Sequence, residues 1–261
     1  MNFLKKKEYT QSNKFLTNGY IISKTENRKS IYFLKSLIKA KSEKLLNKKK
    51  IDINKIHKYV SVDNLNEFRL EIIYELNKNK LTRFHYFNSA RNSLYNLAGN
   101  ELMMQKNINL SIQLPNDESS LLPIHSDVWS GDSPYEINLW LPLVNCFNTK
   151  SMYILEKKFY DKFVINFKKK KAKNSSQIFS LVKKKVKWIN IKYGEFLLFD
   201  QSLPHGNVIN KENETRWSMN CRFKSFFSPY GDKKIGEFFL PIKLKPMTQV
   251  GLNYKDPFSN E

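Results

Sequence analysis

The spacing of apolar residues changes near residue 108, and this change constrains the fold more than any other feature of the sequence. In the first third of the chain, apolar side chains recur three and four positions apart, which is the helical period. The first such stripe consists of Ile31, Leu34, Leu37, Ile38 and Leu45. A second consists of Leu65, Phe68, Ile72, Ile73 and Leu76, in a helix that Asp63 is expected to cap. A third, shorter helix is predicted over residues 89–97, ending near Gly99.

From residue 108 onward, apolar and polar residues alternate, as they do in strands that bury one face. The alternation is clearest over 108–114 and 136–143. Further strands are predicted over 151–155, 188–191, 195–199 and 216–226, with turn-forming residues between them. Helices followed by many short strands predict an α+β fold. Its core would be a double-stranded β-helix, the jelly roll of cupin-like proteins, with the N-terminal helices packed on it.

The 261 residues contain no internal repeat and no long low-complexity linker, so a single domain over residues 1–261 is predicted. Its parts would be a mainly helical segment (1–105), the jelly-roll core (106–228) and a C-terminal extension (229–261). Within the core, residues 156–187 are rich in lysine and weakly patterned. We expect them to form a long connection or insertion, and they are a candidate lid.

The formal net charge of +21 is a signal that nucleic-acid binding can produce. Nearly all basic residues are lysines, however. Lysine, asparagine and isoleucine are abundant together, as an AT-rich coding sequence produces without selection for binding. The lysine runs at 48–50, 168–171 and 183–185 are therefore expected to be solvated surface. With two cysteines and no apolar run of secretory or membrane-spanning length, a cytoplasmic protein without a membrane partner is expected.

Three residues are candidate metal ligands: His125, Asp127 and, far downstream, His205. Positions i and i+2 of a strand share a face, so His125 and Asp127 can converge on one ion, and His205 would complete the set from a distant strand. Two histidines and one carboxylate leave coordination positions open, as non-haem Fe(II) requires when it must bind a cosubstrate and O₂. The other two histidines, His57 and His85, have no partners in a recognisable spacing and are expected to be structural. The sequence has no H-E-x-x-H, P-loop or G-x-S-x-G motif to suggest other chemistry.

Further residues around these ligands form a pattern. It comprises the block from His125 to Leu143, Gly194-Glu195, Phe199-Asp200, His205-Gly206, Asn210 and Arg216, and near the N-terminus Gly19 to Ile22. With this pattern the chain resembles the phytanoyl-CoA dioxygenase-like group of Fe(II)/2-oxoglutarate oxygenases, and more narrowly the branch encoded in sporadic carbohydrate-biosynthesis clusters. The resemblance implies Fe(II), with 2-oxoglutarate and O₂ as cosubstrates, and oxidation of a substrate C–H bond with release of succinate and CO₂. It also implies a sugar or nucleotide-sugar substrate in surface-polysaccharide biosynthesis.

The resemblance suggests a role for Arg216, which follows His205 by eleven residues. This is similar to the family's spacing for the arginine that binds the distal carboxylate of 2-oxoglutarate. Ser218 leaves the same strand face two residues later and is expected to support that carboxylate. Arg222 shares the face but lies roughly 20 Å along the strand, so it is expected either to contact substrate or to pair with a surface acid.

On the strand over 136–143, Asn138 and Trp140 share the face opposite the apolar residues. One face of such a barrel strand points into the cavity. Asn138 is therefore expected to contact the cosubstrate and Trp140 to form a wall of the site, unless both face solvent or a covering helix. Asn109, Ser111 and Gln113, on an earlier strand, are weaker candidates for the same roles.

These observations predict an Fe(II)- and 2-oxoglutarate-dependent dioxygenase that hydroxylates or otherwise oxidises a small molecule. The basic surface is compatible with an anionic or phosphorylated sugar. Two alternatives stay open. Nucleic-acid-directed oxygenases of this chemistry have two arginines six residues apart, as Arg216 and Arg222 are, although the distance from His205 fits them poorly. A non-catalytic jelly-roll module could instead bind a sugar or a partner through the same cavity, but the intact ligand set argues against it.

Overall fold

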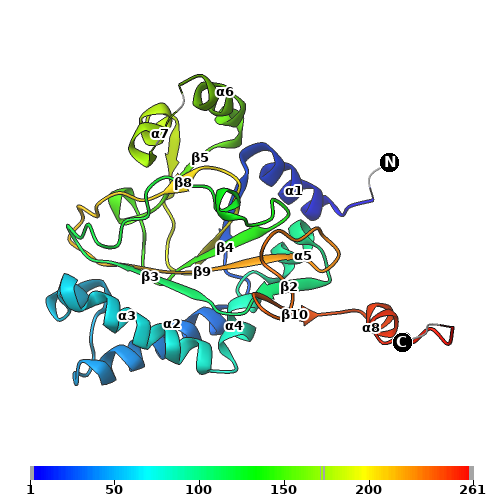
Figure 1. The fold of residues 1–261 in the computed structure, drawn as a ribbon. Helices are drawn as coiled ribbons and strands as arrows, with labels where there is room; N and C mark the ends of the chain where they lie inside the picture. Colours follow the sequence, from blue (N-terminus) through cyan, green and yellow to red (C-terminus); the bar gives the residue numbers. More distant parts are fainter. Residues whose placement is uncertain (1–2, 171, 173, 259–261) are drawn as a thin grey trace.

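Two antiparallel sheets face each other in the computed structural model, which describes residues 3–170, 172 and 174–258 (Figure 1). The larger sheet has the order β1 (Tyr20–Lys24), β7 (Glu195–Asp200), β4 (Ile137–Pro142), β9 (Arg216–Ser225), β2 (Leu102–Gln105) and β10 (Phe239–Lys243), with β3 (Asn109–Gln113) also paired to β9. The smaller sheet has the order β6 (Val186–Trp188), β5 (Tyr153–Leu155) and β8 (His205–Gly206). This arrangement confirms the predicted α+β jelly roll.

Strand β9 connects the larger sheet because it is long enough to pair with three others. One edge pairs with β4 from Ser218 to Phe223, and the other edge pairs first with β3 and then with β2. The predicted strands over 108–114, 136–143 and 216–226 therefore become direct neighbours. Strands β1, β2 and β10 were not predicted. They are short, and two of them lie within the segment predicted to be mainly helical.

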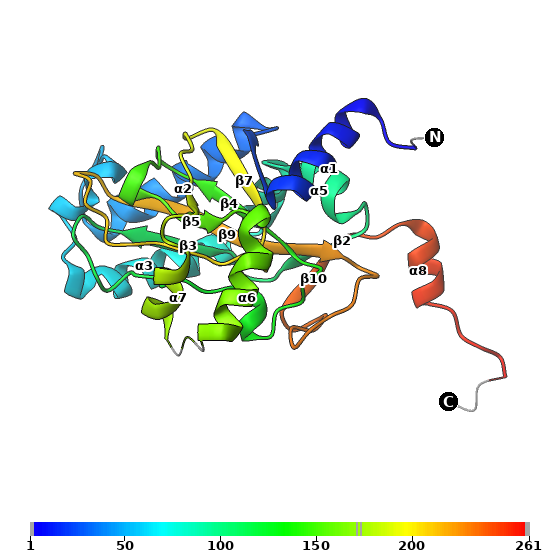
Figure 2. The same cartoon turned by 90° about the horizontal axis from the view of Figure 1, so that it is seen from above.

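Helices cover the outer face of the larger sheet (Figures 1 and 2). The helical elements are α1 (Lys6–Asn18), α2 (Arg28–Leu45), α3 (Val62–Lys78), α4 (Thr82–Asn88), α5 (Arg91–Ala98), α6 (Tyr160–Lys170), α7 (Ser175–Val182) and α8 (Pro246–Leu252). The three predicted helices correspond to α2, α3 and α5. The prediction that Asp63 caps the second was wrong: Ser61 is the N-cap, and Asp63 lies in the first turn. Helices α1 and α4 were not predicted from the sequence.

Buried aromatic side chains fix the helical layer to the sheet. Trp217 of β9 is fully buried, donates from its ring nitrogen to the carbonyl oxygen of Ile53 at 2.8 Å, and meets the ring of Phe68 of α3 edge-on at 6.3 Å. The Tyr86 hydroxyl of α4 donates to the carbonyl oxygen of Leu139 in β4 at 2.6 Å. These contacts attach the helical layer to the outer face of β4 and β9. The inner face of these strands is therefore free to line a cavity between the sheets.

The lysine-rich segment 156–187, predicted to be a long connection or insertion, has helical structure that the sequence analysis did not predict. It contains α6 and α7, which pack on the smaller sheet with a hydrophobic cluster of their own. The fully buried members of that cluster are Ile124, Tyr153, Leu155, Phe163 and Val182. The spacing of Phe163 and Phe167 is helical, but the surrounding lysines hide the pattern.

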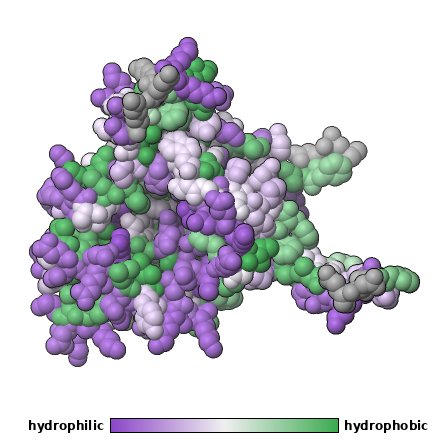
Figure 3. All heavy atoms as spheres, in the orientation of Figure 1, coloured by the Kyte–Doolittle hydropathy of each residue, from purple (hydrophilic) through white to green (hydrophobic). Residues whose placement is uncertain are grey.

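The surface is rich in hydrophilic residues, most visibly over the helical layer formed by α2 and α3 (Figure 3). Of the 168–171 lysine run, Lys168 and Lys169 are exposed or partly exposed, and Lys171 lies outside the described residues. Among the helices that the structure describes, none combines the length and the apolar character that a membrane span requires.

Candidate functional site

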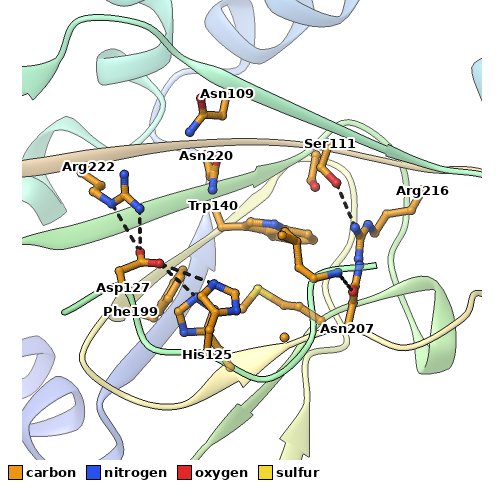
Figure 4. Close-up of a pocket in the computed structure, with 15 residues that line it drawn as sticks. Asn109, Ser111, His125, Asp127, Trp140, Phe199, Asn207, Arg216, Asn220 and Arg222 are labelled. Carbon is orange, nitrogen blue, oxygen red and sulfur yellow. Dashed lines mark hydrogen bonds and ion pairs between the residues drawn. The ribbon is translucent and has the colours of Figure 1, made fainter. Parts of the chain in front are cut away.

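The three candidate ligands His125, Asp127 and His205 converge at one place in the fold, and Figure 4 shows the first two of them at the cavity. His125 and His205 lie opposite each other in an isolated antiparallel bridge, with backbone N–H···O distances of 2.9 and 2.8 Å. The sequence predicts that Asp127 lies on a strand, but it does not. It is the first residue of a 3₁₀ turn, η2 (Asp127–Ser130), which follows the extended Ser126. One ligand atom from each of the three residues lies within 4.8 Å of the other two.

The backbone fixes which imidazole nitrogens can bind a metal. The Nδ1 of His125 lies 2.8 Å from the carbonyl oxygen of Pro123, and the Nδ1 of His205 lies 2.8 Å from that of Leu203. A carbonyl can only accept, so each Nδ1 must be the protonated nitrogen and each Nε2 has a free lone pair. The Nε2 atoms lie 3.5 and 3.8 Å from Oδ1 of Asp127. Both lone pairs therefore face the carboxylate, as metal-binding histidines with oriented rings require.

The electrostatics of the cluster favour a bound dication. Burial lowers the pKa of His205 to about 4, so its imidazole is neutral at pH 7. Burial alone would raise the pKa of Asp127. At the acid pH where this carboxyl titrates both histidines are protonated, and the hydrogen bond from His125 together with the charges of His205 and Arg222 holds its pKa well below the usual range. Burial alone would lower the pKa of His125, but the hydrogen bonds to Asp127 and Pro123 outweigh burial and raise this pKa above its ordinary value. A carboxylate and two inward-facing imidazoles form a donor set suited to Fe(II).

A cavity of about 250 Å³ extends from these ligands across the inner face of the larger sheet. Alternate residues of two paired strands line it, because side chains two positions apart share a face. These are Asn109 and Ser111 of β3, and Arg216, Ser218, Asn220 and Arg222 of β9.

Arg216 lies at the end of the cavity remote from Asp127 (Figure 4). It is almost fully buried, and its Nη2 donates to the Ser111 hydroxyl at 2.9 Å. Burial lowers the pKa of Arg216 to about 10, so it is cationic at pH 7. The Nε of Arg216 and the Oγ of Ser218 are both buried without a hydrogen-bond partner in the described structure. An anion with several acceptor oxygens would satisfy both groups.

The other predicted residues are divided between the cavity and its surroundings. Trp140 of β4 lines the cavity, whereas Asn138 lies outside it, with its amide nitrogen 3.5 Å from Oδ2 of Asp127. Gln113 also lies outside and donates to the carbonyl oxygen of Val208. Arg222 does not pair with a surface acid: it contacts the buried Asp127 and Asp132 at 3.2 and 3.4 Å. None of the described residues of segment 156–187 lines this cavity.

The two remaining histidines have the structural contacts expected of them. The Nδ1 of His57 lies 2.9 Å from the Thr215 hydroxyl, and that of His85 lies 3.0 Å from the Ser30 hydroxyl. Neither histidine lines the cavity.

Four cavity residues were not identified from the sequence: Leu122, Met152, Asn207 and Asn220. Asn220 could have been found, because it continues the alternation of Arg216 and Ser218 along β9. Asn207 follows the same rule from His205. Met152 has no such signal, because it precedes β5 and reaches the cavity only through the approach of the smaller sheet.

With this geometry established, comparisons with known proteins place the fold in one class. No protein-family model matches the chain, and no curated protein matches it. Solved structures, however, share its architecture at low identity, and they include non-haem, 2-oxoglutarate-dependent oxygenases. The fold is the one these oxygenases have. The phytanoyl-CoA dioxygenase-like branch stays a prediction.

Three of these structures illustrate the likeness. ThoJ, a non-haem monooxygenase in complex with nickel, aligns with a TM-score of 0.55 at 12% identity, over 90% of this chain and 84% of ThoJ. HygX from Streptomyces hygroscopicus, with nickel and 2-oxoglutarate bound, has a TM-score of 0.52 at 10% identity, over 89% of this chain and 90% of HygX. SnoK, an alpha-ketoglutarate-dependent carbocyclase from nogalamycin biosynthesis, has a TM-score of 0.55 at 12% identity, over 92% of this chain and 97% of SnoK.

Proposed function

We propose that this protein is an Fe(II)- and 2-oxoglutarate-dependent dioxygenase that oxidises, most simply by hydroxylation, a C–H bond of a small hydroxyl-rich substrate. One observation supports this more than any other. The His125, Asp127 and His205 cluster lies in the same cavity as the buried Arg216, whose Nε has no hydrogen-bond partner within the described residues. A dicarboxylate bound at the metal could then extend to the cation Arg216. A site that only held a metal would not need this buried cation.

Each of the proposed site residues has a distinct task. His125, Asp127 and His205 would hold Fe(II), which when bound supplies the oxidising chemistry with O₂ and 2-oxoglutarate. Arg216 would bind the distal carboxylate of 2-oxoglutarate through charge-assisted hydrogen bonds, with the Ser218 hydroxyl as a further donor. The burial of both groups excludes water from these bonds and so strengthens them.

The cavity residues that remain favour a neutral, hydroxyl-rich group as the part of the substrate that reacts. The carboxamides of Asn109 and Asn220 lie side by side in the β3–β9 register, and neither has a hydrogen bond within the described residues. Trp140 occupies the matching position on β4 and offers an aromatic surface to the C–H face of a sugar ring. Arg222 is already paired with two carboxylates, so we propose that any phosphate of the substrate lies outside the cavity.

A sugar or nucleotide-sugar precursor of surface polysaccharide, modified in the cytoplasm, is the substrate we propose. The resemblance in the block from His125 to Leu143 supports this choice, and the neutral carboxamides are compatible with it. Salt-dependent binding of DNA or RNA would favour the nucleic-acid alternative instead.

Succinate formation tests the proposal. Protein purified without oxygen is given Fe(II), 2-oxoglutarate and O₂, beside Asp127→Ala and Arg216→Ala variants, and then a panel of nucleotide sugars. We expect succinate from the native protein that depends on Fe(II) and is lost in both variants. If the native protein forms neither succinate nor a spectroscopically visible Fe(II)–2-oxoglutarate complex, the non-catalytic binding module becomes the better interpretation.

A further inference from the structure

Arg222 contacts the proposed metal ligand Asp127 at two points. Its Nε and Nη2 atoms lie 3.3 and 3.2 Å from Oδ2 of Asp127. The other oxygen, Oδ1, is the one that faces the Nε2 atoms of His125 and His205. The two oxygens of this carboxylate therefore have different partners, and only Oδ1 faces the proposed metal position.

The guanidinium of Arg222 is itself held in place. Its Nη2 lies 3.4 Å from Oδ2 of the buried Asp132, and its Nε donates to Oε1 of Gln201 at 3.0 Å. The side-chain amide of Gln201 cannot flip freely, because its Nε2 donates a hydrogen bond to Glu136 at 2.8 Å. The backbone carbonyl of Gln201 also accepts from the backbone N–H of Asp127 at 3.1 Å. Gln201 thus fixes both members of the Arg222–Asp127 pair.

Arg216 provides a contrast on the same strand face. Arg216 donates to the hydroxyl of Ser111 and the carbonyl of Ser151, and it forms no ion pair with an acidic residue among those the structure describes, so its charge is available to a bound anion. Arg222, six residues further along β9, already has two carboxylates as partners. The two arginines therefore have different roles, because Arg222 is already paired with carboxylates before any ligand binds.

From this geometry we infer that Arg222 is a positioning residue that restricts Asp127 to binding the metal through a single oxygen. The inference rests on the proposed function. A carboxylate free to rotate keeps Oδ1 directed at the two imidazoles for only part of the time, which weakens metal binding. When both of its oxygens do bind, fewer positions remain for 2-oxoglutarate. A planar guanidinium that contacts Oδ2 through two nitrogens opposes that rotation, which a lysine ammonium cannot do in the same way.

Two variants separate positioning from charge. Arg222 is a cation beside a cation site, so if only its charge mattered, Arg222→Met would tighten metal binding and Arg222→Lys would leave it unchanged. A positioning role predicts weaker binding in both variants, by roughly 10–100-fold, as for other groups that orient metal ligands. Affinities for Co(II), and for Fe(II) without oxygen, are measured by competition with a chelator, and the visible spectrum of the Co(II) form reports a change in coordination.

Two further arginine variants serve as controls. Arg83→Lys changes an arginine outside the cavity that donates to the backbone oxygens of Met104 and Leu240, so it should leave metal affinity unchanged. Arg216→Lys should weaken 2-oxoglutarate binding while retaining native metal affinity. Circular dichroism checks the fold of each variant. If Arg222→Met does not fold, Arg222→Lys decides alone, because it keeps the charge.

The outcomes separate this inference from the proposed function. Weaker metal binding by Arg222→Lys with an altered Co(II) spectrum supports the positioning role. Native metal affinity in Arg222→Lys, or tighter binding by Arg222→Met, overturns it while leaving the dioxygenase proposal in place. If the native protein binds neither Co(II) nor Fe(II), the proposed function fails first, and the inference fails with it.

Discussion

Replacing Arg216 by methionine should separate cosubstrate binding from metal binding. Methionine is unbranched, flexible and apolar, so it fills much of the space in a pocket where Arg216 is almost fully buried. The variant loses the cation and the donors that we assign to the distal carboxylate of 2-oxoglutarate. Each hydrogen bond to a charged group contributes about 1.5–3 kcal/mol, so two lost bonds amount to at least about 3 kcal/mol. This corresponds to a rise of roughly 100-fold in the Kd for 2-oxoglutarate.

The assay is a titration of the metal-loaded protein with 2-oxoglutarate in the absence of oxygen. Metal affinity should stay at the native value, because Arg216 contacts none of the three proposed ligands. Without 2-oxoglutarate, the variant should be at least as stable as the native protein, because a buried cation with no acidic partner is costly to maintain. Arg83→Met is the matched control. A Kd for Arg216→Met within threefold of the native value would refute the assignment of this arginine to the cosubstrate.

Three other predictions concern stability and loop geometry. At 100 times its Kd, Co(II) should raise the free energy of unfolding by about 2.7 kcal/mol in thermal scans, and neither EDTA-treated protein nor Asp127→Ala should show this gain. Tyr86→Phe removes the hydrogen bond to Leu139, so urea denaturation should show a loss of about 1–2 kcal/mol with metal affinity unchanged. Gly131 has a φ of +90°, and a Cβ there would collide with Asp232. Gly131→Ala should therefore distort the turn that begins at Asp127 and weaken Co(II) binding, and native affinity in this variant would count against that coupling.

Much of the fold could be predicted because burial leaves a local trace in the sequence. The stripe that includes Ile31, Leu34 and Ile38 identifies α2, since these side chains are buried in the main core. The alternation around Leu139 identifies β4 in the same way. The helices of the insertion at 156–187 were not predicted because their apolar residues pack mainly on a small separate cluster, and the frequent lysines obscure the helical period.

A part of the candidate site could also be predicted from the sequence. The residue types and spacing of His125, Asp127 and His205 suggested a metal centre, and strand parity suggested that Ser218 accompanies Arg216. The same parity places Asn138 on the inner face of β4, where its amide lies beside the candidate ligand Asp127 rather than among the residues that line the cavity. The partners of Arg222 had no local signal. Asp127 and Asp132 lie about ninety residues away in the sequence, and only the packing of η2 against β9 brings them within contact.

The sequence by itself therefore determined the helices α2, α3 and α5, the strands β3, β4, β7 and β9, the presence of a jelly-roll pattern and the identity of the candidate ligands, because these depend on residue type and on neighbours a few positions away. The tertiary structure decided which strands pair, which nitrogen of each histidine faces Asp127, and which arginine stays free for a ligand. Those outcomes depend on long-range strand register and on backbone carbonyls such as those of Pro123 and Leu203, whose positions no local pattern in the sequence specifies.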